Sequence, residues 1–178
     1  LAVAAGCLGG VVWGLIPAYL KAYRGISEIV ITLMLNYVGI QVCSLLVHEP
    51  SPMAEKGAFY PQSLPILPGA HLPILIKGTS LHLGIVIGLV AALFIYLALK
   101  YTPFGMRTRI TGQNPEAARY AGIDVKRQIV LVLLLSCGLG GLAGTGEVLG
   151  LKLKLYDYFS MGLGYDAIAV ALMANSNP

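Results

Sequence analysis

Three polar side chains lie inside long apolar stretches of this 178-residue sequence, where they could hydrogen-bond a polar solute. Asn36 and Gln41 belong to the stretch ITLMLNYVGIQV, and Glu147 lies near the end of a later apolar run. A polar group in hydrocarbon is costly unless it has a partner, so such residues can mark a solute pathway. The alternative is an interhelical hydrogen bond for the two amides, and for Glu147 a carboxylate that reaches the membrane interface. Both interpretations are kept.

A second set of informative residues lies in the polar segment TGQNPEAARYAGIDVKR, residues 111–127. Asn114 is a favourable N-cap, and Pro115 suits the first helical position, where its missing N–H is not needed. Gly122 can take the left-handed conformation that ends a helix. These signals predict a short helix over residues 114–122.

A free helix of about two turns is marginal in water, so contact with another surface would stabilise it. Ala117 and Ala118 add little bulk and would let a partner surface come close. Glu116 in the first turn and Arg119 toward the end complement the helix dipole and could make charged contacts. The segment is either a docking helix for a cytoplasmic partner or a capped loop that only connects two membrane spans, and the residues alone do not decide between these.

Other kinds of chemistry find no support in the sequence. Cys7, Cys43 and Cys137 each lie in an apolar run without metal or redox spacing, which indicates small buried hydrophobes. The three histidines lack ligand spacing, so we expect no metal site. There is no G-x-x-x-x-G-K-[ST] phosphate loop and no catalytic arrangement such as H-E-x-x-H. We expect no catalytic residues and no cofactor bound by this chain.

The composition indicates a membrane protein, because 57% of the residues are hydrophobic and only 11% are charged. A soluble domain carries roughly 25% charged residues. A membrane-spanning helix needs about 20 apolar residues. Four runs satisfy this, namely residues 1–20, 28–47, 81–99 and 129–149, and a shorter run at 162–175 is a partial or re-entrant segment. The predicted fold is an all-α polytopic bundle of transmembrane helices in one domain, with a short cytoplasmic helix.

The orientation follows from the lysines and arginines, which gather in the loops on the cytoplasmic side. The loop after the first run and the polar stretch at residues 100–128 together hold eight basic residues. The Pro-rich loop at residues 48–80 and the connection at 152–160 hold four. The stretch at 100–128, which contains the short helix, is therefore predicted to be cytoplasmic, and the Pro-rich loop external.

Glycines recur every four residues in three of these runs, at the spacing that lets helix backbones approach closely. We expect helix contacts along these rows: Gly6, Gly10 and Gly14; Gly84 and Gly88; Gly140 and Gly144; Gly146 and Gly150.

Four segments, in sequence order, resemble one family of membrane proteins. GQNPEAARYAGIDVKR is similar to the cytoplasmic coupling loop of ABC-type importer permeases of the branched-chain amino acid, ribose and nucleoside group. SEIVITLMLNYVGI, SCGLGGLAGTGEVLG and GLGYDAIAVALMANSNP resemble segments of its nucleoside subgroup. Family members are longer, so we expect this chain to be the central portion of a larger permease.

The resemblance implies a transport subunit that depends on other proteins. A separate cytoplasmic ABC ATPase would use ATP and Mg²⁺, a second permease subunit would complete the pore, and an external substrate-binding lipoprotein would deliver the solute. No nucleic-acid partner is implied. The protein would be a multi-pass subunit located in the bacterial cytoplasmic membrane. Its coupling residues would be those of the short helix: Asn114, Pro115, Glu116, Ala117, Ala118, Arg119 and Gly122.

Two alternatives remain for the function. The same machine could import a simple sugar or a branched-chain amino acid, because only resemblance favours nucleosides. An ion-coupled secondary transporter would be a different class, and it usually carries acidic residues in mid-membrane. Glu28 and Glu147 both lie near the ends of their runs, which disfavours that class.

Overall fold

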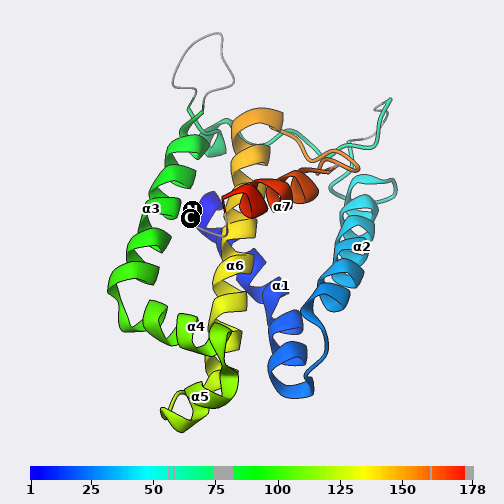
Figure 1. Cartoon of the computed structure of the whole chain (residues 1–178). Helices are drawn as coiled ribbons and strands as arrows, with labels where there is room; N and C mark the ends of the chain where they lie inside the picture. Colours follow the sequence, from blue (N-terminus) through cyan, green and yellow to red (C-terminus); the bar gives the residue numbers. More distant parts are fainter. Residues whose placement is uncertain (56, 58, 74–81, 161, 175–178) are drawn as a thin grey trace. The chain divides into compact units, whose positions relative to one another are not determined.

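The computed structural model describes residues 1–55, 57, 59–73, 82–160 and 162–174 (Figure 1). No strand occurs among these residues, which pair across the chain only in two isolated β-bridges, Ala54 with Ser63 and Gln62 with Tyr156. The predicted all-α fold is confirmed. The chain divides into two compact units, Leu1–Thr32 with Val86–Thr145 and Leu33–Ile85 with Gly146–Pro178, which are described separately below.

Four described helices are long and apolar enough to cross a membrane. They are α1 (Ala2–Arg24), α2 (Glu28–Val47), α3 (Leu83–Tyr101) and α6 (Val125–Glu147), the last continued by the π-helical turn η2 (Val148–Lys152). Their mean hydropathy is 1.7 to 2.4, yet at most 17% of each apolar window is buried inside the chain. Such uncovered apolar faces require lipid or further protein around them.

The helices agree with the predicted runs to within a few residues. α2 has the expected bounds, α1 continues to Arg24 rather than Leu20, and α6 begins at Val125 rather than Ile129. The short apolar run after residue 162 forms α7 (Leu163–Met173), which at 11 residues is too short to span a membrane as a straight helix.

In the first unit, glycines of α1 pack directly against α6. A Cβ added at Gly14 would lie 2.5 Å from the Cβ of Cys137, and one at Gly10 would lie 3.0 Å from the Cα of Gly141. Gly6 meets Thr145 in the same way. The four-residue row on α1 therefore faces a four-residue row on α6, as expected for a close helix crossing.

The other predicted glycine rows are partly wrong. Nothing lies within 4 Å of a Cβ built at Gly88, Gly140, Gly144 or Gly146. α6 uses Gly141 instead, which is one residue, or about 100° of helix rotation, from Gly140. Glycine spacing marks rows on every face of a helix, so it cannot identify the packed face.

The predicted polar stretch at residues 100–128 contains a helix that the sequence analysis missed, α4 (Pro103–Gln113). It begins at Pro103 after Thr102 and precedes α5 (Pro115–Tyr120), on which it packs. Gly105 of α4 is buried against the backbone of Leu99, where a side chain would overlap the carbonyl group. The turn from α3 into α4 is therefore tight.

In the second unit, the loop after α2 and the loop after α6 are hydrogen-bonded to each other. Ser63 N–H donates to the Leu155 carbonyl at 2.8 Å, and Ile66 N–H donates to the Leu153 carbonyl at 3.1 Å. Lys154 pairs with Glu55 at 2.6 Å. We call this set of contacts the loop bracket. Because the bracket joins them, both loops lie on one side of any membrane that the helices cross.

Candidate functional site

The short helix α5 has the N-terminus that the sequence predicts. The Asn114 side-chain oxygen accepts hydrogen bonds from Glu116 N–H at 3.0 Å and from Ala117 N–H at 3.1 Å. Asn114 itself is extended, and Pro115 occupies the first turn. Two of the N–H groups that a helix start leaves without partners are thus satisfied by one side chain.

The C-terminus of α5 is closed by two backbone hydrogen bonds of the Schellman type. Ile123 N–H donates to the Ala118 carbonyl at 2.9 Å, and Gly122 N–H donates to the Arg119 carbonyl at 3.0 Å. Gly122 has φ of 76°, which glycine adopts without steric cost. The predicted role of Gly122 as terminator is confirmed, and the helix is six residues long.

Ala118 corrects one expectation about this helix. Its side chain is 0% exposed, so α5 rests on its own chain at this position, and the methyl group cannot set the approach distance of a partner. Glu116, Ala117 and Arg119 are exposed, and Tyr120 is 94% exposed. The surface that α5 offers to a partner therefore excludes Ala118 and is polar and aromatic.

α4 supports α5 and is itself fastened to α6 by Gln128. The Gln128 side-chain amide, 6% exposed, donates to the Thr108 hydroxyl at 2.6 Å and to the Phe104 carbonyl at 3.4 Å. The nearby Thr111 hydroxyl is buried and has no partner among the described residues. Sequence analysis missed this link, although a lone Gln at the start of an apolar helix is a signal for a buried hydrogen bond.

The turn from α5 into α6 is held by Asp124. Its carboxylate accepts from Arg127 N–H at 3.1 Å and pairs with the Arg127 guanidinium at 3.2 Å. The carboxylate thus caps the first turn of α6. α5 is thus joined to α6 directly by this capped turn and, through α4, by the Gln128 link.

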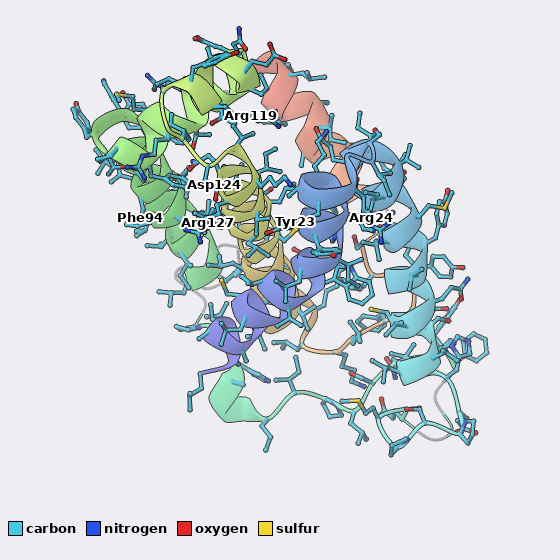
Figure 2. All side chains as sticks on the ribbon, turned by 90° about the horizontal axis from the view of Figure 1, so that it is seen from below. Tyr23, Arg24, Phe94, Arg119, Asp124 and Arg127 are labelled. Carbon is cyan, nitrogen blue, oxygen red and sulfur yellow. The ribbon has the colours of Figure 1, made fainter. Side chains whose placement is uncertain are left out.

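The end of the first unit that carries α5 is basic. Figure 2 looks onto this end, where Arg24 of α1, Arg119 of α5 and Arg127 of α6 are exposed. Lys126 lies 5.3 Å above the ring of Tyr23. The structure thus brings basic residues of both predicted cytoplasmic loops to one end of this unit, and the orientation itself stays a prediction.

The candidate pathway residues are not brought together by any contact in the described structure. Asn36 and Gln41 are exposed on α2, and neither side chain has a hydrogen-bond partner among the described residues. Their five-residue separation places them about 140° apart around the helix. Neither a pathway role nor the alternative, an interhelical bond, is observed for them within this chain.

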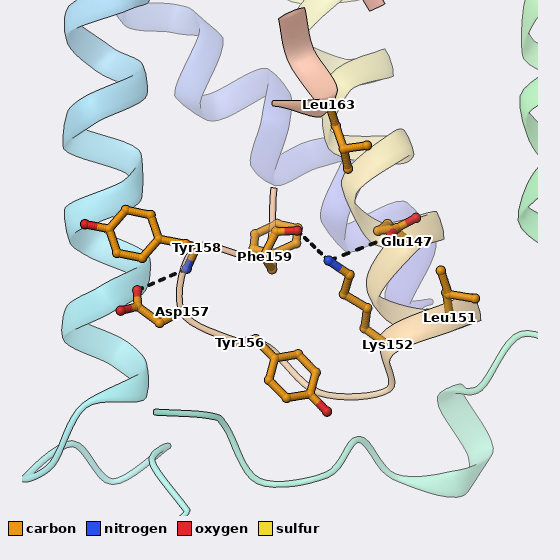
Figure 3. Close-up of a pocket in the computed structure, with 8 residues that line it drawn as sticks. All are labelled: Glu147, Leu151, Lys152, Tyr156, Asp157, Tyr158, Phe159 and Leu163. Carbon is orange, nitrogen blue, oxygen red and sulfur yellow. Dashed lines mark hydrogen bonds and ion pairs between the residues drawn. The ribbon is translucent and has the colours of Figure 1, made fainter. Parts of the chain in front are cut away.

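Glu147, the third pathway candidate, lies at the rim of a pocket in the second unit (Figure 3). Its carboxylate is 3.8 Å from the Lys152 ammonium, which donates a hydrogen bond to the Phe159 carbonyl. The pocket has a volume of about 620 Å³. The lining residues are Glu147, Leu151, Lys152, Tyr156, Asp157, Tyr158, Phe159 and Leu163.

Three aromatic residues contribute to the wall of this pocket. Tyr156, Tyr158 and Phe159 follow η2, and the loop bracket bends their segment so that all three line the pocket. The Gln62–Tyr156 bridge and a hydrogen bond from Asp157 N–H to the Pro61 carbonyl, 3.2 Å long, hold it there. A sequence stretch cannot reveal a pocket whose shape depends on a loop about 90 residues away.

Comparisons with known proteins identify relatives along the whole chain. Residues 1–178 match the family described as the permease component of branched-chain amino acid transport systems. The chain is 29% identical to the guanosine ABC transporter permease of Bacillus subtilis, over 99% of this chain and 51% of that protein. It is 30% identical to a glucose ABC transporter permease of Haloferax volcanii, over 97% of this chain and 48% of that protein.

A further relative is the nucleoside ABC transporter permease of Lactococcus lactis, 28% identical over 100% of this chain and 51% of that protein. The chain thus spans about half the length of these curated relatives. No solved structure gives a significant match.

Proposed function

This chain belongs to the family of permease components of branched-chain amino acid transport systems, and we propose that it is part of the permease subunit of an ATP-driven importer for nucleosides. It is an integral membrane protein of the plasma membrane with several membrane-crossing helices. The observation that carries the proposal is α5, a short helix closed at both ends, supported from behind and exposed in front. Such a helix is suited to receive force from another protein.

In the proposed mechanism, a separate cytoplasmic ATPase docks on the exposed face of α5. Glu116 and Arg119 supply charged contacts, and Tyr120 supplies an aromatic one. The buried Ala118 side chain fixes α5 on its own chain, so α5 does not slide when it is pushed. Asn114, Pro115 and Gly122 keep the helix formed while it is under load.

Movement of α5 would then change the membrane helices. The Gln128 link and the Asp124 turn join α5 and α4 to the start of α6. α6 is packed on α1 along the glycine rows, so the two helices would tilt together. A rigid-body tilt of this kind can switch a pathway between outward-facing and inward-facing states. A second permease subunit and an external binding protein complete the proposed machine.

The nucleoside assignment is supported by two of the relatives named above, whose names specify guanosine and nucleosides. The glucose permease of Haloferax volcanii favours a sugar as the second candidate. Asn36 and Gln41 are proposed as pathway residues that would face the second subunit or the missing part of the permease. Their exposed amides, which have no hydrogen-bond partner among the described residues, fit either kind of solute, because both carry hydroxyl groups.

The test uses the complete permease with its ATPase and binding protein in liposomes. Uptake of labelled uridine and guanosine is measured with and without internal ATP, in competition with ribose, glucose and leucine. ATP-dependent uptake that nucleosides compete and the other solutes do not would support the proposal. ATP-dependent uptake of glucose or leucine instead would refute the nucleoside assignment alone. Uptake driven only by an ion gradient would refute the importer class.

A further inference from the structure

The pocket beside Glu147 has the size and the wall chemistry of a small-molecule site. Its volume of about 620 Å³ lies within the range of ligand pockets. The walls combine aromatic rings with two carboxylates, Glu147 and Asp157, and one ammonium group, all from residues 147–163 (Figure 3). It lies in the loop that the positive-inside rule places outside the membrane, next to the end of a membrane helix.

The pocket wall is held in shape before any ligand arrives. The loop bracket fastens it at several points, including Leu155 N–H to the Ser63 hydroxyl at 2.9 Å. Leu153 and Tyr158 have φ of 55° and 53°, a left-handed conformation that non-glycine residues seldom adopt. Both lie between residues that the bracket or the Lys152 contacts hold. A wall fixed in this way loses little conformational entropy on binding.

The three charged groups of the pocket are not equivalent, and one of them, the Asp157 carboxylate, already accepts a hydrogen bond from Tyr158 N–H at 3.1 Å. The Lys152 ammonium donates to the Phe159 carbonyl and lies 5.5 Å above the Phe159 ring. Among the described residues, the Glu147 carboxylate has only the 3.8 Å pair with Lys152, which is longer than a hydrogen bond. Its side chain is 28% exposed, so its oxygens can accept hydrogen bonds from a ligand. The pocket therefore offers acceptors beside aromatic faces.

We propose that this pocket is an entry site that holds a nucleoside on the external side of the permease. The Glu147 carboxylate accepts hydrogen bonds from the two neighbouring hydroxyls of the ribose. The rings of Tyr156 and Phe159 pack on the flat base, an interaction that tolerates different bases. The inference rests on the proposed importer function and specifies where the solute first contacts the permease.

The same chemistry favours a nucleoside over the other solute classes. A branched-chain amino acid has an ammonium group for Glu147 but no flat ring for the aromatic side chains. A simple sugar has hydroxyls for Glu147 and presents only the C–H face of a puckered ring to the aromatic side chains. A nucleoside uses both kinds of wall.

Photochemical labelling tests the proposal directly. The complete permease in lipid nanodiscs is irradiated with 4-thiouridine, and the adduct is located by mass spectrometry. We expect an adduct within residues 147–163 that excess uridine or guanosine suppresses and leucine does not. Glu147→Gln and Phe159→Leu should each weaken the competition by uridine about tenfold. The two variants change different parts of the pocket, the carboxylate and an aromatic ring, so misfolding of one variant does not decide the result.

Matched controls come from the same external side. Glu49→Gln and Phe59→Leu make the same chemical changes outside the pocket, at exposed residues of the loop after α2. Both should label and compete as the unaltered permease does.

The result that overturns the proposal is separable from failure of the importer function. ATP-dependent uridine uptake is measured on the same variants in liposomes. Uptake without a competed adduct at residues 147–163 would refute the entry site and leave the importer intact. Equal effects of the pocket variants and their controls would also refute it. A competed adduct without ATP-dependent uptake would support the site and refute the importer.

Discussion

The hydrogen bond from Gln128 to Thr108 connects α4 to the membrane helix α6. We predict that Gln128→Leu loosens this connection while it preserves the bulk of the side chain. The Thr108 hydroxyl still donates to the Phe104 carbonyl at 2.8 Å, so the substitution leaves one hydroxyl oxygen without its donor. The weaker contact from Gln128 to the Phe104 carbonyl, at 3.4 Å, is lost as well.

The magnitude follows from these contacts. A net intramolecular hydrogen bond contributes about 0.5–1.5 kcal/mol, and a buried group left unpaired costs about 1–3 kcal/mol. One short bond lost from a residue that is 6% exposed should therefore cost about 2 kcal/mol. Since about 1.4 kcal/mol changes an equilibrium tenfold, α4 would leave α6 more than ten times as often.

The assay compares transport with ATP use. ATP hydrolysed per uridine imported is measured in liposomes, together with the melting temperature of the permease. Gln128→Leu should raise the ATP cost per uridine and lower the melting temperature. Thr108→Val combined with Gln128→Leu should recover part of both, because replacing both partners by apolar groups leaves no unpaired hydroxyl. Additive effects of the two substitutions, or unchanged coupling in Gln128→Leu, would refute the link.

Three further predictions concern α5 and the α1–α6 packing. Ala118→Trp should destabilise the permease by about 1–3 kcal/mol, because no space surrounds the buried Ala118 methyl group. Ala117→Trp, at an exposed position, should leave the melting temperature unchanged and reduce uptake per ATP. Equal melting temperatures of the two variants would contradict this. Asn114→Ala should lower the uptake per ATP, because it removes a helix cap that contributes about 1 kcal/mol. Asn114→Asp should restore the uptake per ATP, and failure to do so would count against the capping role. Gly10→Ala should separate α1 from α6 and lower the melting temperature. Gly9→Ala should not, since nothing lies within 4 Å of a Cβ built there. Equal melting temperatures of the two variants would contradict the close contact of α1 with α6.

The sequence predicts those features whose causes are local. The start and end of α5 depend on Asn114, Pro115 and Gly122, which lie within nine residues of one another, and all three have the expected roles. The apolar runs likewise predict the long helices, because length and hydropathy alone determine them. The burial of Ala118 could not be predicted, since it depends on packing against residues outside α5.

Features that depend on distant parts of the chain were missed or misplaced. α4 has no clear apolar periodicity, and the Thr102–Pro103 start was its only strong local signal. The pocket depends on the loop bracket, which joins residues that no sequence pattern relates. Whether Asn36 and Gln41 line a pathway remains a prediction, because both are exposed and neither side chain has a hydrogen-bond partner among the described residues.

The loop bracket also constrains the order in which the protein can be built. Glu55 and Lys154 are 99 residues apart, and Ser63 and Leu155 are 92 apart. During synthesis the loop after α2 therefore stays without these partners until α3 and α6 have both been inserted. A chain in which either helix entered the membrane incorrectly would leave the two loops on opposite sides, where no bracket can form. Formation of the bracket is thus a late event that only correctly inserted chains complete. A quality-control protease on the outer side could distinguish incorrectly inserted chains from correct ones by their exposed, unpaired loop.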